Sequence, residues 1–324
     1  MGYVYIQGFN KPVDITDTEE ILINIPTGAS TAKIGDILYD NELIHNTTYF
    51  KYVSKKMNTG KKYQAGDYKL SKNQNLNDII DTIANGRVFV DTVIITIPEG
   101  FEAIQIVDRI SSNEKLNLNK DKLLDLIDNG EFDYKFLNAL PDDTEHRLEG
   151  FLFPDTYEFK VGISEEEVIK VFLERFDNVF KEEYYQRAEE LGMSVYEVIS
   201  LSSIIEREAQ LTEERPVISG VFYNRLDKNM RLQSCATVQY IIGERKPVLS
   251  IKDTQIDSPY NTYKYAGLTP GPIASPGENA IKAALYPEET DYLYFVARGD
   301  GGHVFTDNYK DHLNAKNKIK AQNK

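Results

Sequence analysis

The first third of the chain alternates short β-type runs with helical patterns. Two of these runs, Ile21–Gly28 and Val93–Gly100, resemble each other, because each is rich in β-branched residues and ends at a Pro-x-Gly turn. An amphipathic stretch follows each run, at 34–39 and at 103–110, so both copies are predicted to form a strand, a turn and a helix. We therefore expect small α+β modules in this part of the chain.

A further strand and two helices are predicted in the same region. Gly66–Leu70 has the pattern of a strand, and apolar residues at helical spacing over 76–83 predict a helix that ends at Asn85-Gly86. Another short helix is predicted over 120–130. The region contains no obvious catalytic cluster, which favours a spacer or a recognition module.

A loop at Leu140–Asp143 marks the predicted domain boundary. We place the break near residue 145, which gives an N-terminal α+β region at 1–145 and a second domain at 146–324. The chain length of 324 residues agrees with about two domains.

Two S-x-x-E capping boxes, which begin at Ser164 and Ser194, predict helices in the second domain. The first helix is expected to run to about Leu191, and the second to cover 195–210. A third helix is predicted over 216–226.

The end of the chain has the pattern of a β-hairpin followed by a helix. Two β-type runs, 292–296 and 303–305, flank the glycine-rich turn Arg298–Gly302. A lysine-rich helix with a solvated surface is expected from Lys310 onward. The predicted fold class is therefore α+β, with small N-terminal modules followed by a mixed α/β domain that ends in a hairpin.

Composition and charge exclude several classes of protein. The net charge of −14 repels phosphate backbones and anionic bilayers, so we expect no nucleic acid as a partner. The single cysteine, Cys235, excludes an internal disulfide and a multi-thiolate metal site, and the four histidines have no metal-binding spacing. We therefore expect neither a metal nor a cofactor. Apolar runs such as Val93–Ile97 are far shorter than the ~18 residues that would span a bilayer.

One carboxylate falls on the apolar face of the predicted helix at 195–210. Val198, Leu201, Ile204 and Ile205 form the apolar stripe of this helix, and the next step along the stripe reaches Glu208. Partial burial favours the protonated form of a carboxyl, so Glu208 is a candidate general acid near neutral pH.

A second acid, Glu206, is turned by ~200° to nearly the opposite face, so the two acids are not expected to share one task. The structural alternative is that Glu208 simply forms an ion pair with an arginine such as Arg215 or Arg225.

Three segments after this helix offer the groups that sugars need. The segments 230–240 and 258–263 combine amides, hydroxyls and aromatic rings, which hydrogen-bond sugar hydroxyls and stack on sugar CH faces. The proline- and glycine-rich loop at 267–277 can present backbone groups at a cleft wall, although an architectural turn explains it equally well.

Seven motifs together carry a family resemblance. They are E-G-F-L-F-P-D-T-Y at 149–157, S-I-I-E-R-E-A at 203–209, V-F-Y-N-R-L at 221–226, M-R-L-Q at 230–233, Y-N-T-Y at 260–263, the loop at 267–277 and the hairpin at 292–305. In this order and spacing they resemble the endolytic murein transglycosylases of the YceG-like (MltG) type. The resemblance covers essentially the whole chain, weakly before residue 60 and strongly from about 145 to 306.

The resemblance implies a LysM-like module in the N-terminal region and a catalytic domain with one essential glutamate. That glutamate is predicted to be Glu208, with Glu206 as the fallback. Peptidoglycan glycan strands are the implied substrate, cut after the muramyl residue to give a 1,6-anhydro end. The predicted substrate-binding residues are Gln233, Thr237, Tyr240, Asn261, Thr262, Tyr263, Gly271 and Ser275.

The resemblance also implies a location and partners. Family members normally begin with a membrane anchor and act at the outer face of the cytoplasmic membrane, beside glycan polymerases or penicillin-binding proteins of the elongation machinery. No anchor precedes Tyr3 here, so the sequence is interpreted as starting after it. Where relatives usually carry Asp-Pro, this chain has Cys235-Ala236, which argues against a required acid at that position.

Two alternatives remain open. A lysozyme-like hydrolase would need a second carboxylate ~5 to 9.5 Å from Glu208, and Asp253, Asp257 or Glu149 could supply it. A non-catalytic wall-binding scaffold of the elongation machinery is the other alternative, in which the N-terminal modules alone would act.

Overall fold

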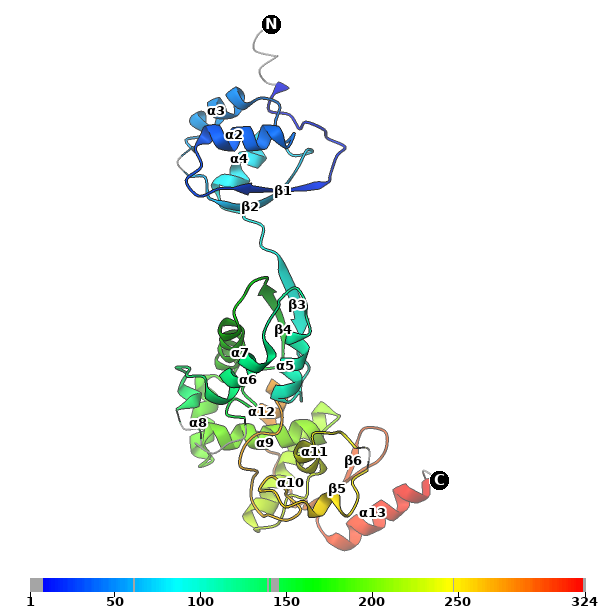
Figure 1. Ribbon diagram of the computed structural model, residues 1–324. Helices are drawn as coiled ribbons and strands as arrows, with labels where there is room; N and C mark the ends of the chain where they lie inside the picture. The colour runs from blue at the N-terminus through cyan, green and yellow to red at the C-terminus, as the bar shows by residue number, and fades with distance from the viewer. Residues whose placement is uncertain (1–7, 61, 139, 141–145, 247, 323–324) are drawn as a thin grey trace. The chain divides into compact units, whose positions relative to one another are not determined.

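The chain folds into two compact units that divide after Asp91 (Figure 1). The structure, a computed structural model, describes residues 8–60, 62–138, 140, 146–246 and 248–322. The boundary predicted near residue 145, with most of its loop at 141–145, lies outside the described residues. Residues 92–138 belong to the second unit, because the strand β3 (Thr92–Thr96) pairs with β4 (Thr156–Lys160), which lies beyond that predicted boundary.

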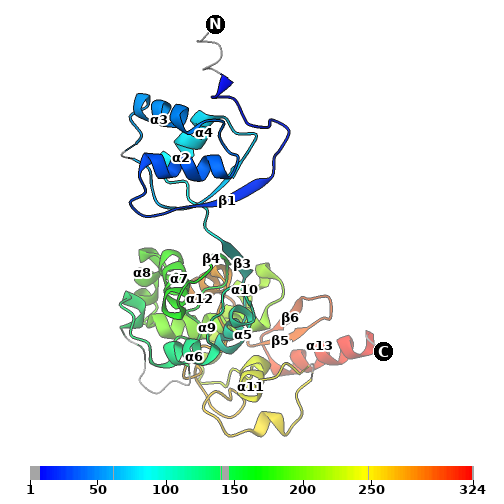
Figure 2. The ribbon, with the colours of Figure 1, turned by 45° about the horizontal axis from the view of Figure 1, so that its top comes forward.

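The first unit places helices on one face of a strand pair (Figure 2). Its elements are β1 (Glu20–Ile25), α2 (Thr31–Asp40), α3 (Thr47–Lys56), β2 (Gly66–Ser71) and α4 (Leu76–Ala84). β1 and β2 are antiparallel, with Glu20 opposite Ser71 and Ile25 opposite Gly66. Along each strand, every second side chain points into the core, as Ile23 does in β1 and Tyr68 does in β2. Their neighbours in the same strand face solvent, as the period of a half-buried strand requires.

The second unit is built mainly from helices around one large core. After β3 its elements are α5 (Ala103–Ser111), α6 (Lys120–Asn129), η1 (Lys135–Leu137), β4, α7 (Glu165–Val179), α8 (Glu182–Glu190), α9 (Val195–Glu208), η2 (Thr212–Glu214), α10 (Arg215–Asp227), α11 (Cys235–Ile242), η3 (Asp253–Gln255), α12 (Glu278–Leu285), β5 (Tyr294–Ala297), β6 (His303–Thr306) and α13 (Tyr309–Gln322). Helices and small antiparallel sheets are mixed in both units, so the predicted α+β class is confirmed.

Helix α9 lies at the centre of the second unit. It contacts α8, α10, α11 and α12, and every residue from Val198 to Ile205 is buried (Figure 1). The capping box of Ser194 and Glu197 starts the helix as predicted, and Ala209 ends it in an extended conformation. The polar residues on the face of α9 opposite its apolar stripe are buried too, because the loop 267–277 and α12 cover that face.

One predicted helix is two helices in the structure. The expected helix from Ser164 to about Leu191 breaks between α7 and α8, where Phe180 leaves the helical conformation with φ −79° and ψ 75°. The Phe180 ring is buried, stacks on Phe176 at 5.6 Å between ring centroids and meets Tyr184 edge to face. Burial of this aromatic cluster offsets the loss of helical continuity, which a capping pattern alone does not reveal.

The predicted hairpin and the final helix are both confirmed. β5 and β6 pair antiparallel, with Tyr294 opposite Thr306, and Arg298–Gly302 connects them. α13 has no buried residue, as expected for a solvated helix.

Gly150 provides a test of how tightly the core is packed around α9. It has φ +84°, and a Cβ placed on it would lie 2.6 Å from Pro272 and 2.9 Å from Ile199. Gly162 has the same backbone conformation, φ +85°, with nothing within 4 Å. We expect Gly150→Ala to lower the free energy of unfolding by about 1–3 kcal/mol more than Gly162→Ala does, since only the first adds a steric clash to the backbone strain. Urea unfolding of both variants measures this difference, and equal losses would contradict the close packing.

Candidate active site

The last turn of α9 carries three charged residues with three different sets of partners. Glu206 points to Arg215 and the loop 267–277, Arg207 pairs with Glu102 at 3.0 Å, and Glu208 points to the start of α11. Residues two apart on a helix differ by ~200° in direction, so Glu206 and Glu208 face different surroundings. The predicted separation of the two acids is confirmed by these partners.

Glu206 is the more buried of the two acids. Its side chain is 6% exposed, its Oε1 lies 2.7 Å from Arg215 Nη2, and its Oε2 accepts a hydrogen bond from the Gly277 N–H at 3.1 Å. Arg215 also lies 3.4 Å from Glu99. Burial raises the pKa of Glu206 to about 7, against the opposing effect of the Arg215 charge. This carboxylate ties α9, α10 and the loop 267–277 together.

Glu208 is half-buried and accepts a hydrogen bond from the Ser234 hydroxyl. Among the described residues no lysine, arginine or histidine lies within ion-pair distance of it. The alternative in which Glu208 pairs with Arg215 or Arg225 is therefore not what the structure has. Arg215 pairs with Glu206, and Arg225 donates to backbone carbonyls, among them Leu293 at 2.6 Å.

The surroundings of Glu208 contain two further proton donors. The thiol of Cys235 and the hydroxyl of Tyr263 lie 3.1 Å apart. Burial, and to a smaller extent the charge of Glu208, raise the pKa of both groups, so both keep their protons at neutral pH. Burial lowers the pKa of Arg225, and the charge of Glu208 is one of the effects that oppose this shift. Cys235, Tyr263 and Arg225 therefore lie near enough to Glu208 for its charge to affect their pKa values.

A buried hydroxyl network holds Ser234 in place. The Ser234 N–H donates to Thr262 Oγ1 at 3.0 Å, and Thr262 Oγ1 lies 2.9 Å from Thr237 Oγ1. Thr237 Oγ1 donates to the Ser234 carbonyl at 2.9 Å. Gln233 next to it is exposed, has φ +52°, and donates its backbone N–H to the Thr262 carbonyl. Thr237 and Thr262 thus position Ser234, while the side chain of Gln233 stays accessible.

Asn261 is fully buried and bonded within the protein. Its Nδ2 donates to the carbonyls of Thr254 and Ile256, and its Oδ1 accepts from the Tyr263 N–H at 3.0 Å. It shapes the turn that carries Tyr263, and its amide is not directed at an open surface.

Three other predicted residues have surroundings of their own. Gly271 is buried beneath the hydroxyls of Tyr196 and Tyr260, and Ser275 is buried with backbone hydrogen bonds to residues 100 and 101. Both belong to the packed side of the loop. Tyr240 lines a cavity of about 230 Å³ together with Tyr260 and Glu149.

Ser234 is the site residue that sequence reasoning missed. It is the N-cap residue of α11, a helix that was not predicted. A serine just before the apolar run Ala236–Ile242 is an N-cap signal, and it could have located this helix start.

Glu149 is a buried acid held at the start of α5. Both of its oxygens lie 3.1 Å from the Ala103 N–H, and Oε1 also accepts from the Gly150 N–H at 3.2 Å. Burial raises the pKa of Glu149 to about 8, against the opposing effect of the Ala103 hydrogen bond. The carboxyl is therefore protonated at neutral pH.

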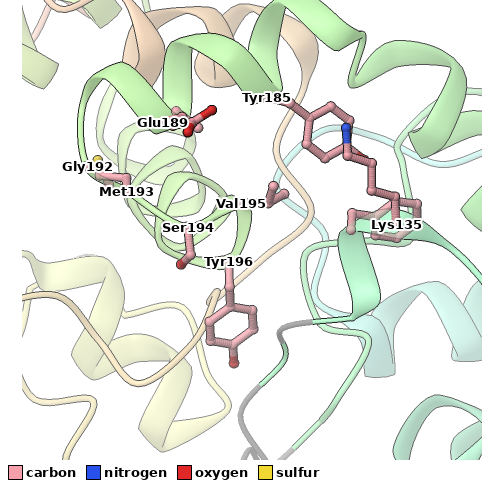
Figure 3. Close-up of a pocket in the computed structure, with 10 residues that line it drawn as sticks. Lys135, Tyr185, Glu189, Gly192, Met193, Ser194, Val195 and Tyr196 are labelled. Carbon is pink, nitrogen blue, oxygen red and sulfur yellow. The ribbon is translucent and has the colours of Figure 1, made fainter.

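A separate cavity of about 400 Å³ lies at the other end of α9 (Figure 3). Its lining includes Lys135, whose ammonium lies over the ring of Tyr185 at 3.9 Å, and the helix start at Ser194–Tyr196. Glu208 follows Tyr196 by twelve steps along the helix, ~18 Å, so this cavity is not part of the Glu208 site.

Neither a metal cluster nor a membrane span is found among the described residues. No three His, Cys, Asp or Glu side chains gather as a metal would require. No helix in the described part of the chain combines the length and apolar character needed to cross a bilayer.

Comparison with known proteins identifies the family. The model of the YceG-like family matches residues 23–318, which is most of the chain. The chain belongs to the YceG-like family. The resemblance inferred from the sequence motifs is thereby confirmed.

Named relatives of this YceG-like chain agree with one another. An endolytic murein transglycosylase of Bacillus subtilis (strain 168) is 37% identical over 98% of the chain and 89% of the relative. One of Streptococcus pneumoniae serotype 2 (strain D39) is 32% identical over 96% of the chain, which spans 60% of that longer protein. The crystal structure of a YceG-like protein from Listeria monocytogenes is 37% identical, covers 91% of this chain and 99% of that one, and superposes with a TM-score of 0.63.

The raised pKa of Glu149 predicts a pH-dependent stability of this YceG-like chain. Between the ordinary pKa of 4.5 and the folded value of about 8, the native state holds a proton that the unfolded state has lost. The stabilisation is complete below pH 4.5 and is lost as the pH rises toward 8, at ~1.4 kcal/mol per unit of pKa shift. We expect the wild type to lose a few kcal/mol more between pH 5 and pH 8 than Glu149→Gln, which keeps the shape of the neutral acid.

Urea unfolding of both proteins at the two pH values measures this loss. Parallel pH dependence of the two proteins would show that Glu149 is already ionised in the fold.

Proposed function

We propose that this protein is an endolytic lytic transglycosylase, which cleaves the bond between N-acetylmuramic acid and N-acetylglucosamine within peptidoglycan strands. The observation that carries the proposal is the half-buried carboxyl of Glu208, which takes part in no ion pair among the described residues and accepts a hydroxyl donor from Ser234. The relatives named as endolytic murein transglycosylases support the substrate and the reaction.

The reaction needs one enzymic acid. Protonated Glu208 donates to the glycosidic oxygen as the bond to C1 breaks with oxocarbenium character. The resulting carboxylate then takes the proton from the muramyl C6 hydroxyl as that oxygen bonds to C1, which gives the 1,6-anhydro sugar and returns the proton to Glu208. Because the nucleophile belongs to the substrate, its effective concentration is high and no enzyme-bound water is needed.

The groups around Glu208 fit this task. Ser234 orients the carboxyl, and the protonated Tyr263 and Cys235 are donors beside it. Gln233 is the exposed amide that remains available for a sugar hydroxyl or an N-acetyl group. Thr237, Thr262 and Asn261 act through the positions of Ser234 and Tyr263.

The three acids considered for the lysozyme-like alternative are all bound by other groups of the protein. Asp253 is bound by Ser250 and Lys246, and these contacts hold the pKa of its carboxyl below its usual range. Asp257 is bound in the same way by Lys264 and Tyr265, with the same effect on its pKa. Glu149 caps α5. None of the three shares a hydrogen bond with Glu208.

The first unit is proposed to be a LysM-like wall-binding module. Two helices, α2 and α3, lie between two antiparallel strands, β1 and β2, in the chain order strand, helix, helix, strand. This order supports the assignment, since a small α+β module without a catalytic cluster suits recognition of a polymer. The domain that performs the chemistry is then the second unit.

The location and the partners follow from the substrate. Peptidoglycan lies outside the cytoplasmic membrane, so we place the protein on the extracytoplasmic side, held by an N-terminal membrane anchor. Glycan polymerases or penicillin-binding proteins of the elongation machinery are its proposed neighbours, because they produce the strands that it cuts.

Substitution of Glu208 tests the proposed activity. We expect Glu208→Gln to slow cleavage of un-cross-linked strands by at least about a hundredfold, since general acid–base catalysis contributes ~10²–10⁴-fold. Glu206→Gln should keep turnover within about tenfold while lowering the melting temperature, because it removes the buried partner of Arg215. Mass spectrometry of the wild-type products should show anhydro ends. Full cleavage by Glu208→Gln, or reducing muramyl ends from the wild type, would contradict the proposal.

Removal of the Ser234 hydroxyl tests how Glu208 is positioned. Negative charge develops on Glu208 as it gives up its proton, and a hydrogen bond to a charged group is worth ~1.5–3 kcal/mol, so Ser234→Ala should lower kcat by about tenfold or more with little change in KM. Ser234→Thr keeps a hydroxyl and should retain most of the activity. Equal kcat values for the alanine variant and the wild type would show that this contact has no role in the reaction.

A further inference from the structure

The first unit contains a groove that neither the proposed chemistry nor the family assignment uses. It has a volume of about 1060 Å³ and lies along the outer side of α3, between the segment at Phe9–Lys11 and the start of α4 at Asn77. All residues that line it belong to the first unit. It is the largest of the cavities described above, and it lies in the unit without a catalytic cluster.

Aromatic rings form one wall of the groove. Tyr49 and Tyr52 are stacked, with ring centroids 6.1 Å apart and planes inclined by 29°. Tyr52 is 58% exposed, so its ring is open to solvent. The exposed ring of Tyr52 and the half-buried ring of Tyr49, one helical turn away, provide a stacking surface for the CH faces of sugar rings.

Amide groups line the groove beside the rings. Asn10, Asn46 and Asn77 come from three different segments. The Oδ1 atom of Asn10 is buried and has no hydrogen-bond partner. Since a buried acceptor without a partner is costly, a ligand that donates a hydroxyl or an amide N–H to it would be stabilised.

The charge of the groove is opposite to that of the chain. The charged residues among its lining are Lys11 and Lys56, and both are exposed. Neither forms an ion pair with another residue in the part of the chain that the structure describes. In a protein with a net charge of −14, two unpaired lysines in one groove favour an anionic ligand.

We propose that this groove binds a carboxylate-bearing glycan strand, with sugar faces on Tyr49 and Tyr52 and carboxylates at Lys11 and Lys56. The proposal rests on the proposed function, because a peptide-free strand of N-acetylglucosamine and N-acetylmuramic acid carries one lactyl carboxylate on every second sugar. The groove then binds peptide-free stretches of the polymer that the second unit cuts, and its lysines contact the acidic sugar while its rings contact acidic and neutral sugars alike.

The absence of tryptophan from the chain makes the groove directly observable. Tyr52→Trp places a single fluorescent indole on the groove wall, and this variant is the groove reporter. Tyr39→Trp places one on α2, at a position that is 52% exposed and outside the groove, and this variant is the control reporter. Each of the two substitutions is made separately in the full chain, together with Glu208→Gln. The ligands are a peptide-free tetrasaccharide of alternating N-acetylglucosamine and N-acetylmuramic acid, the neutral N-acetylglucosamine tetramer, and poly(glycerol phosphate).

We expect the carboxylated tetrasaccharide to change the emission of the groove reporter saturably and to leave the emission of the control reporter unchanged. The neutral tetramer should bind at least about fourfold more weakly, and added salt should weaken only the carboxylated ligand. Lys11→Gln and Lys56→Gln should each weaken binding by about two- to fivefold, as expected for exposed charge pairs. In the chain with Glu208 intact, the formation of anhydro products from the tetrasaccharide measures the proposed activity separately from binding in the groove.

The proposal is overturned if the groove reporter shows no saturable response, if both reporters respond equally, or if the neutral tetramer binds as tightly as the carboxylated one. Tighter binding of poly(glycerol phosphate) than of the tetrasaccharide would likewise replace the glycan with a phosphate polymer. Mass spectrometry of the tetrasaccharide after the titration, and of the products of the chain with Glu208 intact, reports on the proposed activity separately. A failure of the groove is therefore distinguishable from a failure of the catalytic proposal.

Discussion

The buried ion pair between Glu206 and Arg215 is the constraint on which the site depends. It joins the last turn of α9 to α10, and the second oxygen of Glu206 holds the loop 267–277 through the Gly277 N–H. Because a buried carboxylate without a partner costs several kcal/mol, this arrangement fixes the rotation of the helix end. The helical repeat then turns Glu208 away from the loop and toward Ser234. Glu206 secures the framework, and Glu208 is the acid that we propose for the chemistry.

Two acids of the second unit have a raised pKa, and burial is the main cause in both. Glu149 and Glu206 are carboxyls held inside the protein by backbone N–H groups, and burial raises the pKa of both. Their protons couple the stability of the fold to pH, whereas the half-buried Glu208 is the acid that we propose for the chemistry. A site with one accessible carboxyl suits a reaction whose nucleophile is part of the substrate.

Local signals in the sequence predicted local structure well. The capping boxes at Ser164 and Ser194, the final hairpin and the helix that carries Glu208 could all be inferred from residue type and spacing. The opposite directions of Glu206 and Glu208 followed from the helical repeat alone. Motif order was sufficient for the family, because seven motifs in a fixed order are far more specific than any one of them.

Features that depend on distant segments could not be predicted in this way. The apolar stripe suggested that Glu208 is the desolvated acid, yet Glu206 is more buried, because the loop 267–277 and α10 cover the other face of α9. The break at Phe180 depends on an aromatic cluster, and the pairing of β3 with β4 joins distant segments of the chain. Gly271 is buried because the hydroxyls of two tyrosines from other segments pack against it.

The most direct test of a single-carboxylate mechanism uses a glycan strand in which the muramyl C6 hydroxyl is replaced by hydrogen. We expect the enzyme to bind this 6-deoxy strand and leave it uncut, because the only nucleophile has been removed. Cleavage of the 6-deoxy strand to a reducing muramyl end, with oxygen taken from ¹⁸O-labelled water, would show that the protein activates water and that a second group assists Glu208.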